Sequence, residues 1–262
     1  MNCFAGNENF NPRIIIYIWV VKSTDMTAET IFKDITSYGE AHVNQERVEK
    51  YLRYFKEGYD AYGLDHDQVD LKIQEILSSP DMTQDLALEL SLLLVKSPKY
   101  ELTVIAIQLV KSYHKDWTIR TFKTVEKWFS IGITNWAQTD YICGELMNLF
   151  FKKKLIDLDS ISNWRSAKNK FQRRAAVVSL IKPMKTSDDF QPFFGFIDPM
   201  MMDPDREVHQ GLGWFLREAW KKQPEPTELV LMKWKNTAAR LIFQYATEKM
   251  TPEGKQKFRK EK

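Results

Sequence analysis

Apolar residues recur at helical spacing along almost the whole chain, and this pattern restricts the fold more than any other feature. From Met26 onward the apolar positions follow the 3.6-residue period of amphipathic helices, and no long stretch shows the two-residue period of a strand. Short polar connections, many of which contain proline, separate these segments. The sequence therefore predicts an all-α fold. The expected helices cover residues 27–37, 44–59, 67–78, 83–96, 99–114, 118–130, 134–152, 156–166, 168–182, 188–197, 205–222, 226–234 and 237–249.

The predicted helices recur with a fixed period. Ala106, Tyr141, Ala176 and Gly211 lie near the middle of every second helix and are 35 residues apart each time. Repeats of this length with two helices each are typical of an α-solenoid of HEAT-like helical repeats, which lines a concave surface with one helix from every repeat. Gly211 and Gly213 lie inside a predicted helix and lower its propensity, which indicates a close approach of another backbone there.

The chain divides into one repeat domain and two extensions. We expect the domain over residues 26–250, a basic C-terminal tail over 251–262, and residues 1–25 outside the fold. The alternative is that the apolar run Ile14–Val21 docks on the first repeat. This run has eight residues, far fewer than the ~20 needed to span a bilayer, so no membrane segment is expected.

Composition excludes several classes of protein. The two cysteines, Cys3 and Cys143, form no disulfide framework, which fits a reducing cytoplasm. The four histidines show no metal-ligand spacing, so neither a metal site nor a cofactor is expected. Residues 1–151 contain 15 Lys and Arg against 21 Asp and Glu, whereas residues 152–262 contain 23 against 14. The basic half would hold a polyanion if there is one, although proteins that bind nothing acidic can show the same imbalance.

A tryptophan and an aspartate share one stripe of the predicted helix at 134–152. Ile142 and Leu146 belong to its apolar seam, whereas Trp136 and Asp140 lie off that seam, beside Met147. A carboxylate between an indole and a thioether would be partly desolvated. The alternative is a solvated aspartate next to a tryptophan that packs on a neighbouring element.

Superposition of the repeats predicts a shared functional surface. It places Trp136, Asp140 and Trp214 on equivalent faces, with Arg173 and Arg174 on the intervening helix. Trp214 lies with Arg217 on the polar side of its own helix, although packing under a neighbouring loop would also explain it. Aromatic rings among arginines suit nucleic acid, and a protein-binding groove uses the same residue types.

These motifs resemble a known family. The pattern W-x-x-x-D at 136–140, QRRAAVV at 172–178 and GWFLRE at 213–218 is similar to the AlkD-type DNA alkylation repair glycosylases. The resemblance extends from about Met26 to Met250 and includes YFKEGYDAYG at 54–63. It implies a HEAT-like fold with a concave DNA-binding face and hydrolysis of the N-glycosidic bond of positively charged N3- or N7-alkylpurines in double-stranded DNA.

The resemblance also implies roles for individual residues. Asp140 would be the catalytic carboxylate, and Trp136 and Trp214 would lie against the deoxyribose. Arg174 would contact the DNA backbone, and we assign Arg173, Arg217 and Tyr54 to the same surface. A cationic alkylpurine is already a good leaving group, so a fixed carboxylate that stabilises positive charge on the sugar is sufficient. The family is thought to work from the backbone side without a base pocket. We expect a monomer.

Two positions depart from the family pattern. Ala137 stands where the family often has an acidic residue, and Tyr141 follows Asp140. Some relatives have this fold without robust activity. A catalytically weak HEAT-like DNA-binding protein is therefore the second hypothesis, and a protein-interaction scaffold is the third.

Overall fold

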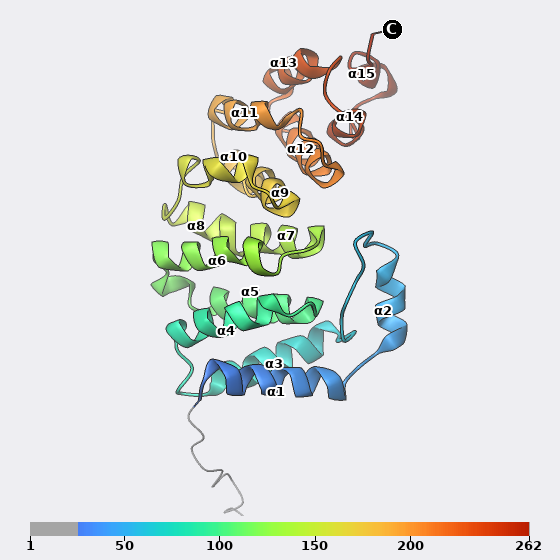
Figure 1. Ribbon diagram of the computed structural model, residues 1–262. Coiled ribbons are helices and arrows are strands. Elements are labelled where there is room, and N and C mark those ends of the chain that lie inside the picture. The colour runs from blue at the N-terminus through green and yellow to red at the C-terminus, as the bar shows by residue number, and fades with distance from the viewer. Residues whose placement is uncertain (1–25, 262) are drawn as a thin grey trace, which may run out of the picture.

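The computed structural model describes residues 26–261, which form a stack of helices that runs from one end of the molecule to the other (Figure 1). No strand occurs within this range, so the predicted all-α fold is confirmed. The proposed extension at residues 1–25 lies outside the described residues. None of the helices in residues 26–261 is both long enough and apolar enough to cross a membrane.

The described helices match most of the predicted segments. They are α1 (Ala28–Ala41), α2 (Gln45–Leu52), α3 (His66–Ser78), α4 (Gln84–Lys96), α5 (Tyr100–Ser112), α6 (Ile119–Ile131), α7 (Trp136–Ile142), α8 (Asn148–Lys152), α9 (Lys170–Val178), α10 (Ile181–Lys185), α11 (Gln191–Ile197), α12 (Arg206–Trp220), α13 (Pro224–Trp234), α14 (Arg240–Ala246) and α15 (Pro252–Gln256). Short 3-10 helices occur at His114–Asp116, Asp159–Ser166 and Asp198–Met200.

The 35-residue period corresponds to one layer of the stack. Helices α5, α7, α9, α12 and α14 pack against one another in this order, and the first four contain Ala106, Tyr141, Ala176 and Gly211. In the second layer, α4 packs against α6. Helices α8 and α10 continue α7 and α9 in the first layer, and they also pack against each other. These helices therefore contact their equivalents in the next repeat, as the predicted helical solenoid requires.

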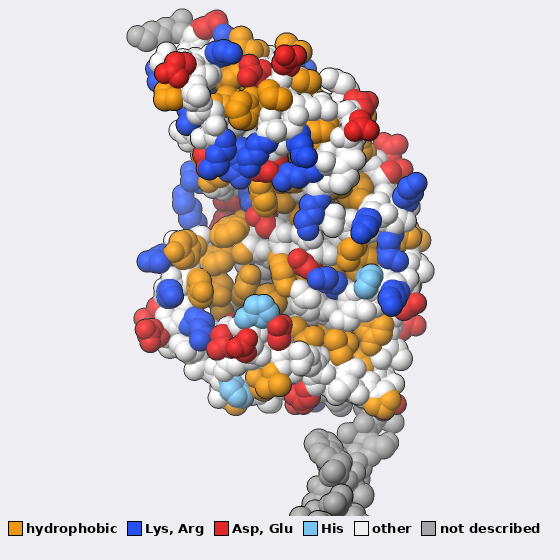
Figure 2. Space-filling view, turned by 180° about the vertical axis from the view of Figure 1, so that it is seen from behind, with side chains coloured by type: hydrophobic (Ala, Val, Ile, Leu, Met, Phe, Trp, Pro, Cys, Tyr) orange, Lys and Arg blue, Asp and Glu red, His pale blue; other side chains and the backbone are white. Residues whose placement is uncertain are grey.

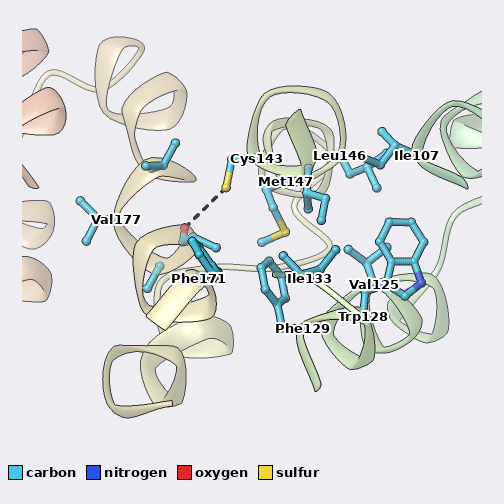
Figure 3. Close-up of a cluster of buried hydrophobic side chains, with 14 of the residues drawn as sticks. Ile107, Val125, Trp128, Phe129, Ile133, Cys143, Leu146, Met147, Phe171 and Val177 are labelled. Carbon is cyan, nitrogen blue, oxygen red and sulfur yellow. Dashed lines mark hydrogen bonds between the residues drawn. The ribbon is translucent and has the colours of Figure 1, made fainter. Parts of the chain in front are cut away.

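A π-helical turn changes the predicted face of the helix at 134–152. The turn covers Cys143–Met147 and connects α7 to α8. Because a π turn holds an extra residue, it rotates the positions that follow it. Met147 is therefore fully buried in the core near Ile133 and Phe171, and it does not lie beside Asp140 as predicted (Figure 3).

The second helix is shorter than predicted. It ends at Leu52 instead of residue 59, and the chain then turns and runs back beside the stack towards α3 in a segment without regular structure (Figure 1). Gly58 and Gly63 adopt positive φ angles of 95° and 82°, which a helix cannot accommodate. The buried carboxylate of Glu101 accepts hydrogen bonds from the backbone amides of residues 62, 63 and 64 at 3.0, 2.6 and 3.1 Å, which anchors the end of this segment.

Two further segments differ from the sequence prediction. The helix expected at 168–182 is divided into α9 and α10, and the second of these contains Pro183, which has no N–H to continue the hydrogen-bond ladder. Residues 251–261, assigned to a basic tail, pack on the last repeat. Phe258 is 1% exposed, and its carbonyl accepts a hydrogen bond from Arg240 at 2.8 Å.

The two glycines of α12 lie at close helix contacts, as predicted. A Cβ atom on Gly211 would lie 3.3 Å from Val178 Cγ2 of α9. A Cβ atom on Gly213 would lie 2.4 Å from Cβ of Tyr245 and 2.7 Å from the Ile242 carbonyl oxygen, both of α14. The backbone of α12 thus approaches its neighbours on both sides.

Gly213→Ala should destabilise the protein. A methyl group would meet the backbone of α14, so we expect a loss of ~1–3 kcal/mol or more in the free energy of unfolding. Gly195→Ala is the matched control, because a Cβ there meets nothing within 4 Å and should add up to ~1 kcal/mol through helix propensity. Denaturant unfolding measures both. Equal effects of the two substitutions would contradict the close contact.

Glu218 should make stability depend on pH. Burial raises the pKa of its carboxyl group, but hydrogen bonds from Lys185 and Lys221 outweigh burial and lower the pKa to about 2. The unfolded value is ~4.3, so the ion pairs stabilise the fold above this pH and are lost as the pH falls towards 2.

Glu218→Gln should therefore lower the free energy of unfolding by up to ~3 kcal/mol near neutral pH and by much less near pH 3. Glu89 is exposed and forms no ion pair with the described residues. The control substitution Glu89→Gln should therefore have little effect at either pH. Urea unfolding at both pH values gives the comparison. If Glu218→Gln lowers the free energy of unfolding by the same amount at both pH values, the result would contradict this role of the carboxylate.

Candidate active site

A buried ion pair joins α7 to α9. Arg174 donates from Nε to Asp140 Oδ1 at 2.8 Å and from Nη2 to Asp140 Oδ2 at 2.7 Å. Its Nη1 donates to the Glu207 carbonyl oxygen at 2.7 Å and so extends the contact to α12. Arg174 is 5% exposed, whereas the side chain of Asp140 is 18% exposed. The two-point contact fixes the plane of a carboxylate that still reaches the surface.

Burial and pairing act in opposite directions on this arginine. Burial alone would lower the pKa of the Arg174 guanidinium, but its hydrogen bonds and its charge attraction with Asp140 outweigh burial and raise the pKa. The guanidinium therefore stays charged, and removal of its partner would leave an uncompensated buried charge. The Asp140 carboxylate therefore stabilises the fold, in addition to any role in a reaction.

A second ion-pair group lies one helical turn earlier on α9. Lys170 Nζ lies 2.8 Å from Glu57 Oε1 and 3.1 Å from Glu207 Oε2. Burial lowers the pKa of the Lys170 ammonium, but the two carboxylates outweigh it and raise the pKa. Glu57 belongs to the segment after α2, so Lys170 connects this segment with α9 and α12. Sequence reasoning missed Lys170, although its i, i+4 spacing from Arg174 places both on one stripe.

The segment after α2 covers one side of Trp136. The ring of Phe55 stacks on the indole with centroids 5.6 Å apart and an angle of 15° between the planes. Trp136 Nε1 donates a hydrogen bond to the Tyr54 carbonyl oxygen at 3.3 Å. The Tyr54 side chain itself is largely exposed, and the Arg53 guanidinium lies 4.9 Å from its ring. Trp136 is therefore held in place by residues that are distant in the sequence.

An aromatic pocket of about 650 Å³ lies beside Trp136. It opens among α3, α5, α7 and the segment after α2. Its lining includes Tyr51, Tyr54, Phe55, Tyr59, Tyr100, Trp136, Ala137 and Tyr141, together with Asp65, His66, Asp70, Glu101 and Gln108. Figure 2 shows a hollow on this side of the molecule, where hydrophobic side chains gather, with Lys and Arg side chains above it on the C-terminal half. No pattern in the sequence indicated this pocket.

Trp214 lies on the face of α12 that approaches the ion pair. Glu207, Gly211 and Trp214 follow one another at i, i+4 and i+7, so they share one side of the helix. On this side, a Cβ atom at Gly211 would lie 3.5 Å from Cγ of Arg174. Trp214 is partly buried and does not line the aromatic pocket. The structure therefore places it towards Arg174 and apart from the pocket beside Trp136.

The other two predicted arginines are engaged elsewhere. Arg173 Nε lies 2.6 Å from Asp203 Oδ2, and Nη2 of the same residue also pairs with Asp205. Arg217 pairs with Glu218 at 3.4 Å and with Glu248. Carboxylates compensate both charges, and neither arginine contacts Asp140.

Cys143 follows Asp140 by three residues but does not act as a nucleophile here. Burial raises the pKa of its thiol to about 12, so the thiol stays protonated at neutral pH. Within residues 26–261, no group of three or more His, Cys, Asp and Glu side chains is placed to hold a metal ion. The reactive group that the arrangement offers is the oriented carboxylate of Asp140, beside an indole and the buried guanidinium of Arg174.

Asp140→Asn should destabilise the fold. Asparagine keeps one acceptor for Arg174 but loses the compensating charge, and breaking such a pair costs ~3 kcal/mol. Asp203→Asn is the matched control, because it breaks a similar two-point arginine pair away from the pocket. Its cost should be comparable or smaller, since Asp205 still pairs with Arg173. Denaturant unfolding of both variants provides the measurement. An Asp140→Asn protein as stable as wild type would contradict the structural role.

The chain is similar to known proteins in its sequence pattern and in its fold. The model of the DNA alkylation repair enzyme family matches residues 40–250. No curated protein sequence matches the chain. A solved structure described as a predicted DNA alkylation repair enzyme from Enterococcus faecalis superposes with a TM-score of 0.64 at 15% identity, over 80% of this chain and 98% of that one. AlkD2 from Streptococcus mutans superposes with a TM-score of 0.54 at 19% identity, over 79% and 99% of the two chains. These two structures share the helical-repeat fold.

Proposed function

The chain belongs to the DNA alkylation repair enzyme family, and from this premise we propose that it is a DNA glycosylase. Its substrates are positively charged N3- or N7-alkylated purines in duplex DNA, which it excises by hydrolysis of the N-glycosidic bond. The proposed setting is base excision repair in the cytoplasm, with the protein acting as a monomer and without a cofactor.

The two-point contact of Arg174 with Asp140 carries this proposal. It presents an oriented carboxylate at the surface, in the turn that follows Trp136 on the same helix. A carboxylate held in this way loses little energy to reorientation when positive charge develops near it. The indole adds the negative face of its ring, which also favours a cation.

The proposed reaction needs few groups from the protein. The bond between C1′ and the base nitrogen breaks, and its electron pair leaves with the cationic base, which becomes neutral. The sugar gains oxocarbenium character, which Asp140 stabilises. Water adds to C1′ and loses a proton to solvent. The reaction needs no general acid, because the departing base already carries the positive charge that a general acid would supply.

The second candidate is a DNA-binding protein of this fold that does not excise bases. The same ion pair favours it, because Arg174 compensates the charge that Asp140 would direct at the sugar. Ala137, in place of the acidic residue that is frequent in the family, points the same way. The glycosylase would release the alkylated base from a bound duplex, whereas the DNA-binding protein would bind the duplex without releasing a base.

Release of 7-methylguanine from methylated duplex DNA tests the proposal. Wild-type protein should release the base, and Asp140→Asn should lower the single-turnover rate by at least ~10²-fold, because the carboxylate acts on charge that develops in the transition state. Trp214→Ala should lower both rate and affinity. Asp203→Asn controls for lost stability and should excise at the wild-type rate below its melting temperature.

The outcomes separate the candidates. Binding of the duplex without base release would support the second candidate and overturn the first. No binding to DNA at any salt concentration would exclude both and leave the protein-interaction scaffold. Excision by Asp140→Asn at the wild-type rate would remove this residue from the reaction.

A further inference from the structure

We propose that Lys170 is a positioning residue, whose ion pair with Glu57 keeps the segment after α2 docked on the helix stack and so fixes the indole of Trp136. This inference rests on the proposed glycosylase function, in which that indole lies against the sugar beside Asp140. Lys170 would act through Trp136 and not on the reacting atoms themselves.

The end of this segment nearest α3 is anchored without Lys170. The Asp60 carbonyl oxygen accepts a hydrogen bond from the Tyr100 amide at 2.8 Å, and the Asp60 carboxylate lies 2.6 Å from Lys99 Nζ. Three further backbone amides of the segment donate to the carboxylate of Glu101. This end is therefore held on α5 by contacts that a change at Lys170 does not remove.

The end of the segment that covers Trp136 has fewer anchors. Its backbone meets the indole through one hydrogen bond, from Nε1 to the Tyr54 carbonyl oxygen at 3.3 Å, and the ring of Phe55 stacks on the indole. Among the described residues, the pair of Glu57 with Lys170 is the only ion pair that joins this end to the helix stack. Lys170 therefore supplies the charged contact that keeps this end docked.

Lys170 lies between two carboxylates that would otherwise repel each other. Its Nζ lies 2.8 Å from Glu57 Oε1 and 3.1 Å from Glu207 Oε2. Burial raises the pKa of Glu57, but hydrogen bonds, the largest of them from Lys170, outweigh burial and lower the pKa. Less than a third of each of the three side chains is exposed, which limits screening by salt. Without the lysine, the charged Glu57 would face Glu207 of α12, and the repulsion would move the segment away from the stack.

Undocking of this end would release the indole and leave the catalytic carboxylate in place. Trp136 is the first residue of α7, and Phe55 together with the Tyr54 carbonyl holds one side of its ring. The pair of Arg174 with Asp140 involves no residue of the segment after α2. A ring that samples several rotamers meets the sugar in the productive geometry for only part of the time, and this loss of orientation lowers the rate.

Double variants separate the docking of the segment from a change in overall charge. Lys170→Gln removes the ammonium and leaves Glu57 opposed to Glu207, whereas Lys170→Arg keeps the positive charge. Lys170→Gln/Glu57→Gln removes the repulsion again. The matched control is Lys170→Gln/Asp60→Asn, which also removes a carboxylate from the segment, but at the end that α5 anchors. An effect of overall charge would be the same in both double variants.

The fluorine NMR signal of Trp136 reports the position of the indole without DNA. The protein is labelled with 5-fluorotryptophan, and Trp136→Phe identifies the signal by its loss. In Lys170→Gln the signal should shift and become more sensitive to exchange of H2O for D2O, because the indole is more exposed to solvent. Lys170→Arg should keep the wild-type signal. Lys170→Gln/Glu57→Gln should return towards it, whereas the control with Asp60→Asn should not. An unchanged Trp136 signal in Lys170→Gln would overturn the proposal.

Base excision should follow the same order. With the duplex saturated by protein in a single turnover, Lys170→Gln should release 7-methylguanine ~5- to 10-fold more slowly than wild type, because the indole has lost its orientation. Lys170→Arg should stay within ~2-fold of wild type, and Lys170→Gln/Glu57→Gln should be at least ~2-fold faster than Lys170→Gln. Lys170→Gln/Asp60→Asn should be no faster than Lys170→Gln.

The two measurements distinguish this proposal from the proposed function. No base release by wild type would overturn the glycosylase, while the fluorine signal would still decide whether Lys170 positions Trp136. A shifted signal with an unchanged excision rate would retain the glycosylase and overturn the role of Lys170 in it. Slower excision with an unchanged signal, or slower excision that Glu57→Gln does not relieve, would assign Lys170 a direct contact with DNA and overturn the proposal.

Discussion

The buried pair between Arg174 and Asp140 is the interaction on which the middle of the structure depends. Three donors of one guanidinium hold α7 through the Asp140 carboxylate and α12 through the Glu207 carbonyl. A buried charge without its partner costs several kcal/mol, so these three helices can stack in only one register at this point. The same contact sets the direction of the carboxylate at the surface. The fold and the candidate site therefore share one constraint, and a change in either affects the other.

Much of the fold could be predicted from the sequence because helical periodicity is local. The close approach at Gly211 and Gly213 was also predictable, since glycine within a helix has few other reasons to occur. The π turn at Cys143–Met147 was not, because nothing in the apolar spacing marks an inserted residue, and Met147 was placed on the wrong face. The early end of α2 depends on Glu101, whose carboxylate anchors a segment some 40 residues earlier in the chain, so only the tertiary structure reveals it.

The candidate site shows the same limit. Spacing within one helix placed Trp136 near Asp140, and the repeat placed Arg174 on the adjacent helix. Packing between helices decides which charges pair, and the sequence alone does not show which of Arg173 and Arg174 pairs with Asp140. The structure turns Arg173 towards Asp203 and Arg174 towards Asp140. Glu57 and Lys170 are 113 residues apart in the sequence, and no local sequence pattern indicates that they form a contact.

The uneven charge of the chain is also seen in the lining of the pocket. Residues 1–151 carry 21 Asp and Glu against 15 Lys and Arg, and they supply every residue of the acidic aromatic pocket, whereas residues 152–262 carry 23 Lys and Arg against 14 Asp and Glu. An alkylated nucleotide in DNA carries charges of both signs, with a cationic base and anionic phosphates. A neutral base in the same backbone offers only the phosphates. Under the proposed function, the basic half would attract the phosphates of any DNA, so this attraction would not distinguish the lesion from undamaged DNA. The chemical step would make the distinction, because only the cationic base leaves without a general acid while Asp140 stabilises the charge on the sugar.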